Sequence, residues 1–93
     1  MIVGIGTIEL RLAENHDLKG KRRVLKSIKD RVRSRFNVSI AEVGDLDAWQ
    51  RATLGVACVS KDRDQVESTL SRVATFVENL HLASVEGVHT ELL

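Results

Sequence analysis

Apolar and polar residues alternate along the first stretch of the chain, Ile2–Leu12. Every second residue from Ile8 to Leu12 is apolar and the residues between them are polar, which is typical of a half-buried β-strand. Val3 and Ile5 lie on the face that becomes polar further along. We therefore predict a long first strand whose N-terminal half is apolar on both faces.

The period changes at Leu18, where apolar residues begin to recur every three or four positions. At 100° per residue these side chains fall within about 80° of arc, which predicts an amphipathic helix. Asp17 directly precedes them and is a suitable N-cap. The residues of the apolar stripe are Leu18, Leu25, Ile28, Val32 and Phe36.

The rest of the chain contains patterns for four more elements. They are a short strand at Val38–Val43, a long strand at Trp49–Val59, a helix from Ser60 or Asp62 to about Leu80, and a strand at Val85–Leu92. The order β-α-β-β-α-β predicts a ferredoxin-like α/β sandwich of the α+β class. We expect a four-stranded antiparallel sheet of order 4-1-3-2, with both helices on one face and the other face uncovered.

Length and composition indicate one small globular domain that spans residues 1–93. The chain has no proline, one cysteine and 29% charged residues, and no apolar run approaches the roughly 18–20 residues of a membrane span. A single cysteine excludes an internal disulfide and fits a reducing compartment. Because no secretion signal opens the chain, we expect a cytoplasmic protein without membrane contact.

The charge is divided unevenly along the chain, although the net charge is only +1. Between Lys19 and Arg35 there are nine basic residues and one acidic residue, Asp30, so this stretch carries +8. The remainder has five basic and twelve acidic residues and carries −7. Such asymmetry points to a polyanionic partner, or else to a basic helix that faces acidic loops or a neighbouring subunit.

Most of these cations fall on one flank of the first predicted helix. Their spacing keeps them in a row roughly 21 Å long at 1.5 Å per residue, and repulsion between like charges makes the row costly to the helix. The row is typical of a surface that follows a phosphate backbone, but a solvated or internally paired face is a comparable interpretation. The candidate nucleic-acid-binding residues, called the basic row below, are Lys19, Arg22, Arg23, Lys26, Lys29 and Arg33.

The uncovered sheet face is the second candidate surface. Its predicted outward residues are too apolar to be comfortable in water, and such a patch usually marks a partner interface. We favour a homodimer through this face or through an edge strand over RNA binding on the face, because RNA-recognition sheets use several aromatics. The candidate interface residues are Val3, Ile5, Trp49, Arg51 and Val59.

Signals for catalysis, cofactors and metals are weak, and we assign none of them. His16, His81 and His89 lack metal-ligand spacing, and Cys58 lies mid-strand among small apolar residues, as a buried inert thiol would. The pair Asp45 and Asp47 is explained better by turn chemistry than by magnesium binding. The run Gly4-Ile5-Gly6 does not open a helix, and its glycines fit close packing of a helix or subunit.

Lys21 differs from the other cations because it falls inside the apolar arc of the first helix. Its long stem could carry the ammonium group past the edge of the sheet into water; otherwise it lines a ligand site. A small-molecule enzyme would depend on Lys21, Arg51 and the two aspartates, and no small-molecule substrate is inferred from so little.

Three runs of residues carry a resemblance over nearly the whole chain. They are His16-Asp17-Leu18-Lys19-Gly20-Lys21-Arg22-Arg23, then Arg35-Phe36-Asn37-Val38-Ser39 with Ala41-Glu42-Val43, then Trp49-Gln50-Arg51-Ala52 with Leu54-Gly55-Val56. At this spacing the chain resembles the YlxP-like family of small bacterial proteins of uncharacterised function. The resemblance implies a ferredoxin-like fold and a cytoplasmic location. It implies no catalytic residues.

The resemblance also bears on function and shows one departure. Genes of that family often lie near those for translation initiation and ribosome-binding factor A, which implies a connection with RNA or the ribosome. Gly20 stands where the family usually has glutamate. Our first hypothesis is thus a non-enzymatic protein that binds RNA or the ribosome through the basic row, and the alternative is a homodimeric interaction module.

Overall fold

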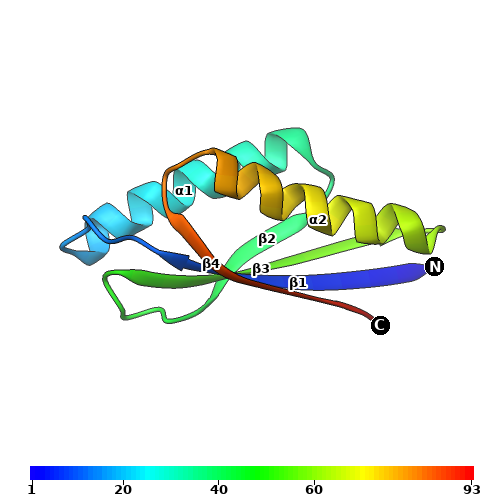
Figure 1. The fold of residues 1–93 in the computed structure, drawn as a ribbon, viewed down its shortest axis with the longest axis horizontal. Helices are drawn as coiled ribbons and strands as arrows, with labels where there is room; N and C mark the ends of the chain where they lie inside the picture. Colours follow the sequence, from blue (N-terminus) through cyan, green and yellow to red (C-terminus); the bar gives the residue numbers. More distant parts are fainter.

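The computed structural model describes residues 1–93 and contains the six predicted elements in the predicted order (Figure 1). Alternation of apolar residues forms the strands, and the three-to-four-residue period forms the helices. The elements are β1 (Ile2–Arg11), α1 (Leu18–Arg35), β2 (Ser39–Gly44), β3 (Arg51–Ser60), α2 (Arg63–Asn79) and β4 (Ser84–Leu92).

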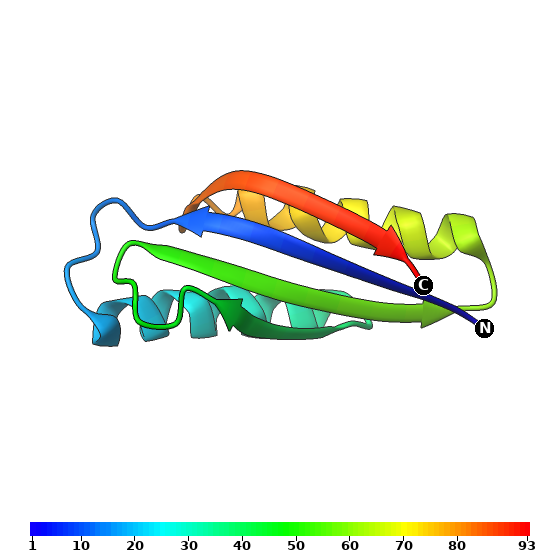
Figure 2. The ribbon, with the colours of Figure 1, turned by 90° about the horizontal axis from the view of Figure 1, so that it is seen from below.

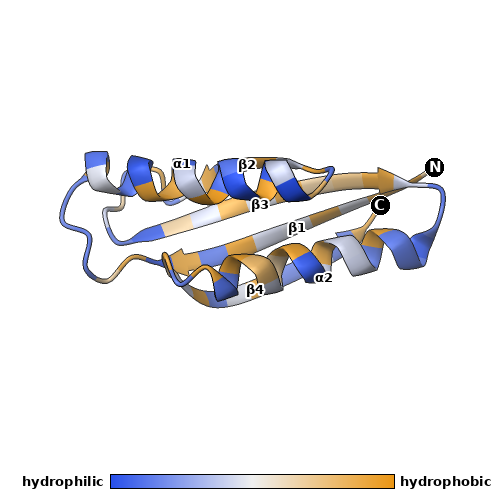
Figure 3. Cartoon of the chain, turned by 90° about the horizontal axis from the view of Figure 1, so that it is seen from above, coloured by the Kyte–Doolittle hydropathy of each residue, from blue (hydrophilic) through white to orange (hydrophobic).

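The four strands form one antiparallel sheet of order β2-β3-β1-β4, seen from its open side in Figure 2. Read from the other edge, this is the predicted order 4-1-3-2. The two ten-residue strands, β1 and β3, lie in the middle. Both helices cover the opposite face of the sheet (Figure 3). The ferredoxin-like α+β prediction is confirmed.

The hydrophobic core fills the space between the helices and the sheet. Ile28 and Val32 of α1, Leu54 of β3 and Val73 of α2 have no exposed surface; burial of such a side chain contributes about 1.5–3 kcal/mol. Gly4 of β1 faces the same layer, where a Cβ would overlap Val66 Cγ1. The predicted close packing at this glycine is therefore packing of α2 on β1.

Two aromatic rings join the helices near the end of α1. Phe36 and Phe76 meet edge to face with ring centroids 5.6 Å apart, an arrangement that adds about 0.5–1.5 kcal/mol beyond burial. The guanidinium of Arg35 lies 5.2 Å from the centre of the Phe76 ring, and that of Arg72 lies 5.6 Å from Phe36. These contacts set the two helices against each other.

The structure corrects the start of one strand and confirms two further predictions. β3 begins at Arg51, so Trp49 lies in the β2–β3 loop and not in the strand. The final strand forms despite Gly87. Cys58 is buried, as predicted, and burial raises the pKa of its thiol. Neither α1 nor α2 combines the length and the apolar composition that a membrane-spanning helix requires.

Candidate nucleic-acid interface

The basic row lies on α1, which is anchored by its other side. Leu25, Ile28 and Val32 point into the core, which leaves the basic row on the side of the helix, where Arg33 reaches the β2 edge of the sheet. Asp17 caps the helix, as predicted, by accepting a hydrogen bond of 2.7 Å from the Gly20 amide. A cap of this kind stabilises a helix by about 1 kcal/mol, which offsets part of the repulsion within the row.

The basic row is exposed to solvent along its length. Five of its six side chains are exposed and Lys29 is half-buried. The nearest carboxylate is Asp30 of the same helix, which lies 2.7 Å from Lys26 Nζ and 3.6 Å from Arg33 Nη1. No acidic side chain of the loops or of α2 lies within 4.0 Å of a cation of the row, so ion pairing of the row by acidic loops is not observed. Four members form no ion pair: Lys19, Arg22, Arg23 and Lys29.

The neighbouring cations of the basic row lower the pKa of the Asp30 carboxyl. The hydrogen bond from Lys26 has the largest effect and holds the pKa of the Asp30 carboxyl below its ordinary value of 3.8. Desolvation opposes it, and the charges of Lys26, Arg33 and Lys29 each lower this pKa by less. Arg33 also donates a 2.8 Å hydrogen bond to the carbonyl of Ile40 on β2. The far end of the row is thus partly engaged, while its beginning is free.

Lys21 does not reach solvent, so the prediction that it extends past the sheet edge is wrong. Its side chain is 1% exposed, and its ammonium donates hydrogen bonds to the carbonyls of Asp45 at 2.6 Å and Ala48 at 2.8 Å. Glu42 Oε2 lies 2.8 Å away as an ion pair, although at an angle outside hydrogen-bond geometry. The β2–β3 loop folds over this charge and closes it off from water.

We call three groups around the Lys21 ammonium its cage: the carbonyls of Asp45 and Ala48 and the carboxylate of Glu42. The cage gives the β2–β3 loop a fixed shape. Asp45 takes a left-handed conformation with φ of 58°, which asparagine and aspartate tolerate better than most residues. Its carbonyl can then accept from Lys21, and the Ala48 amide donates to the same carbonyl at 3.0 Å. Asp45 therefore stabilises the turn, which is the interpretation that the sequence favoured.

A second set of contacts, missed by the sequence analysis, ties this loop to the start of α1. Asn15 Nδ2 donates 2.6 Å hydrogen bonds to the carbonyls of both Trp49 and Asp17. Gln50 Nε2 donates to the carbonyls of Ala13 and Asn15. Figure 2 shows the two loops side by side at one end of the sheet. The departure at Gly20 fits this arrangement, because a Cβ there would overlap Asn15 Oδ1.

The candidate interface residues do not form one patch. Val3 pairs with Val59 across β1 and β3, and Ile5 lies two residues further along the same face. Arg51 is at the opposite end of β3, roughly 27 Å from Val59 at 3.4 Å per residue. Val59 is 58% exposed and Ile5 is 37% exposed, so an apolar patch exists around them. Trp49 and Arg51 belong instead to the loop end of the molecule.

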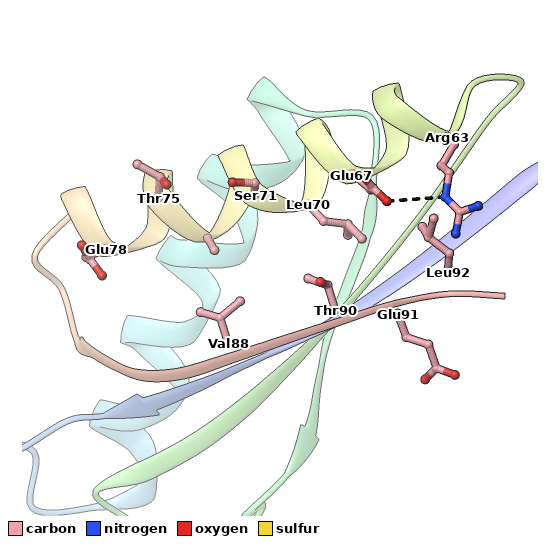
Figure 4. A pocket seen from close by; sticks show the side chains of 11 residues that line it. Arg63, Glu67, Leu70, Ser71, Thr75, Glu78, Val88, Thr90, Glu91 and Leu92 are labelled. Carbon is pink, nitrogen blue, oxygen red and sulfur yellow. Dashed lines mark ion pairs between the residues drawn. The ribbon is translucent and has the colours of Figure 1, made fainter.

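A groove of about 650 Å³ lies between α2 and the edge strand β4 (Figure 4). Val88 faces the helix layer, yet it is 42% exposed because α2 does not cover this edge. Glu67, Glu78 and Glu91 line the groove, and Arg63 is paired with Glu67 at 3.6 Å. This side of the molecule is therefore acidic, opposite in sign to α1.

Comparison with known proteins agrees with the resemblance found in the sequence. Residues 3–90 match the protein family described as "Protein of unknown function (DUF503)". The chain belongs to this family. It is 44% identical over 78 residues to "Uncharacterized protein YlxP" of Bacillus subtilis (strain 168), covering 84% of this chain and 85% of that protein. The predicted YlxP-like family is confirmed.

Solved structures share the fold at low sequence identity. The de novo designed protein Foldit4 aligns over the whole chain and 97% of its own length, with a TM-score of 0.57 and 16% identity. Protein YJCS aligns over 96% of both chains, with a TM-score of 0.53 and 12% identity. At such identity the likeness concerns the fold alone. A designed protein among these neighbours underlines that function must be argued from surface residues.

Proposed function

We propose that this domain is a non-enzymatic, cytoplasmic RNA-binding protein whose basic row contacts phosphates of an RNA, with ribosomal RNA as one such target. The observation that carries the proposal is the set of four exposed or half-buried cations on α1 that lack a carboxylate partner. Phosphate contacts of this kind position a protein on RNA without reading its sequence.

The energetics of the helix support this proposal. Cations at i,i+3 and i,i+4 destabilise an isolated helix by about 0.2–0.5 kcal/mol per pair. The chain offsets this repulsion with only one carboxylate, Asp30, and otherwise leaves the charges facing water. A polyanion would relieve the repulsion and release its own counterions, which is the main source of sequence-independent affinity for nucleic acids.

The test is a charge reversal at the free end of the row, measured as RNA affinity by fluorescence anisotropy. Lys19→Glu with Arg22→Glu should weaken binding of a labelled structured RNA by at least about tenfold at 0.1 M salt. A negative charge at position 19, in the first turn of α1, favours the helix dipole, so this variant should remain folded by circular dichroism.

A matched control makes the same charge change at the start of the other helix. Lys61→Glu with Arg63→Glu alters two exposed cations beside the N-cap of α2, outside the basic row. At 0.1 M salt the Debye length is about 10 Å, so this variant should bind nearly as the wild type does. Equal losses in the two variants, or none in either, would contradict an RNA site on α1.

The alternative is a homodimeric interaction module that uses the open sheet face. Two exposed valines on this face, Val43 and Val59, favour it, and Ile5 lies between them. A dimer would bury these side chains, and Val59→Asp should then dissociate it. Sedimentation equilibrium decides the question, since a strict monomer at high micromolar concentration removes this candidate.

A further inference from the structure

Trp49 is the largest exposed side chain of the β2–β3 loop. It is 57% exposed, whereas a tryptophan with only a structural role usually buries most of its ring. The loop could have closed over Lys21 with any residue at this position, because its contacts with the ammonium are all backbone carbonyls, those of Asp45, Leu46 and Ala48. The indole therefore contributes little to the cage and is presented to solvent.

The backbone beneath Trp49 is held on both sides. Its own carbonyl accepts a hydrogen bond from Asn15, the carbonyl of Ala48 accepts one from Lys21, and the carbonyl of Gln50 accepts one from the Leu12 amide. A backbone held in this way loses little conformational freedom when a ligand stacks on the side chain that it carries. Trp49 is thus an exposed aromatic platform on a rigid loop.

The platform lies beside the free end of the basic row. Asn15 Nδ2 is 2.6 Å from the carbonyl oxygens of both Trp49 and Asp17, so these oxygens are at most twice that distance apart. Asp17 is the N-cap of α1, and Lys19 follows two residues later. An RNA strand whose phosphates contact Lys19 therefore passes close to the loop that carries the indole.

The hollow around Trp49 has groups suited to a nucleobase. It measures about 550 Å³ and is lined by His16, Asp47, Gln50 and Arg51 besides the loop backbone. The Asp47 carboxylate and the amide oxygen of Gln50 can accept from the amino groups on base edges, since Gln50 Nε2 already donates to Ala13 and Asn15. Asp47 would repel a phosphate placed there. Arg51 forms no ion pair and is available to a neighbouring phosphate.

We propose that Trp49 is a base-stacking site for an unpaired nucleotide of RNA, whose adjoining phosphates bind the start of the basic row. This inference rests on the proposed function and adds that the target contains single-stranded bases. Every base has a π-face, so stacking on an aromatic side chain is tolerant of sequence. Specificity would then be for unpaired over fully paired RNA.

Intrinsic fluorescence tests the stacking directly, because Trp49 is the only tryptophan and the chain has no tyrosine. The wild-type protein is titrated with a single-stranded RNA of about twelve nucleotides and, separately, with an abasic chain of the same length. The RNA should quench the Trp49 emission, and the abasic chain should bind through charge without quenching. Binding of both ligands is followed independently by anisotropy of an end label.

Two loop variants separate the indole from the rest of the surface. Trp49→Leu should weaken binding of the RNA about tenfold or more and leave binding of the abasic chain unchanged. The matched control is Leu46→Ala, which removes another exposed apolar side chain of the same loop and should change neither affinity.

The outcomes distinguish this inference from the proposed function. RNA binding that depends on Lys19 and Arg22 but leaves Trp49 emission and the Trp49→Leu affinity unchanged would overturn the stacking site and keep the RNA-binding function. Quenching together with the selective loss in Trp49→Leu supports both. Absence of any binding, by RNA and by the abasic chain, would overturn both.

Discussion

The buried ammonium of Lys21 makes the most specific prediction about stability. Lys21→Met keeps the apolar stem but removes the charge, so Glu42 Oε2 and the carbonyls of Asp45 and Ala48 lose their partner. Removing one partner of a buried ion pair costs about 3–5 kcal/mol. We expect the lower end of this range, since the Glu42 side chain is 19% exposed and water can reach it in part.

The size of this loss matters for a domain of 93 residues. Such a domain has a total stability of only about 5–15 kcal/mol, so Lys21→Met should be folded but much less stable. Glu42→Gln is the milder change, because it keeps the size and polarity of the side chain and removes only the charge 2.8 Å from the ammonium. It should cost less than Lys21→Met does, because the ammonium keeps its hydrogen bonds to the carbonyls of Asp45 and Ala48.

A double-mutant cycle isolates the interaction between the two side chains. Lys21→Met and Glu42→Leu are made singly and together, and the free energy of unfolding is measured in urea by circular dichroism. Because the double variant leaves no unpaired buried charge, its loss should be smaller than the sum of the single losses by about 1–3 kcal/mol. Trp49 emission should report earlier unfolding of the β2–β3 loop in Lys21→Met.

Two results would refute this reasoning. A loss below about 1 kcal/mol in Lys21→Met would mean that the ammonium contributes no more than a surface group does. Strict additivity in the cycle would mean that Lys21 and Glu42 act independently, despite the 2.8 Å between their charged atoms. In either case the fixed shape of the loop would need another explanation.

Three further predictions concern the core and the basic row. Gly4→Ala should destabilise the protein by about 1–3 kcal/mol in urea unfolding, because its Cβ would overlap Val66 Cγ1; unchanged stability would show that α2 can move. Cys58 should react with a thiol reagent slowly in the native state and quickly once unfolded, since burial raises its pKa above 9.0; fast native labelling would contradict the buried position. The Asp30 carboxyl should titrate by NMR below 3.8, so its contribution to stability is present above its unfolded pKa and is lost as the pH falls through the folded value; Lys26→Gln should move the midpoint back toward 3.8, and an unmoved midpoint would contradict the hydrogen bond.

The fold could be predicted because local patterns and burial agree. The alternation in β1 places Ile8 on the helix side and Ile5 on the open side, as observed. The start of β3 could not be predicted, since Trp49 and Gln50 continue the pattern of a strand. Their carbonyls accept hydrogen bonds from the Asn15 side chain and the Leu12 amide. These are tertiary contacts, which a local sequence pattern does not reveal.

The candidate site was predictable in part for a similar reason. The basic row follows from helical spacing and is exposed as expected, although its contact with RNA stays a prediction. The partner of Lys21 left a signal in the sequence: Lys21 lies inside an apolar arc, and Glu42 alternates with Ile40 onto the core side of β2. Two opposite charges at core positions indicate a pair. The loop carbonyls that complete the cage left no such signal.

The salt dependence of RNA binding tests the RNA-binding account most directly. Four free cations predict that the logarithm of the association constant for a single-stranded RNA falls with the logarithm of salt concentration at a slope of about −3. The Lys19→Glu, Arg22→Glu variant should reduce the slope to about −1.4, while the Lys61→Glu, Arg63→Glu variant keeps it. A slope near zero, or one that both variants change alike, would contradict a phosphate-binding role for α1.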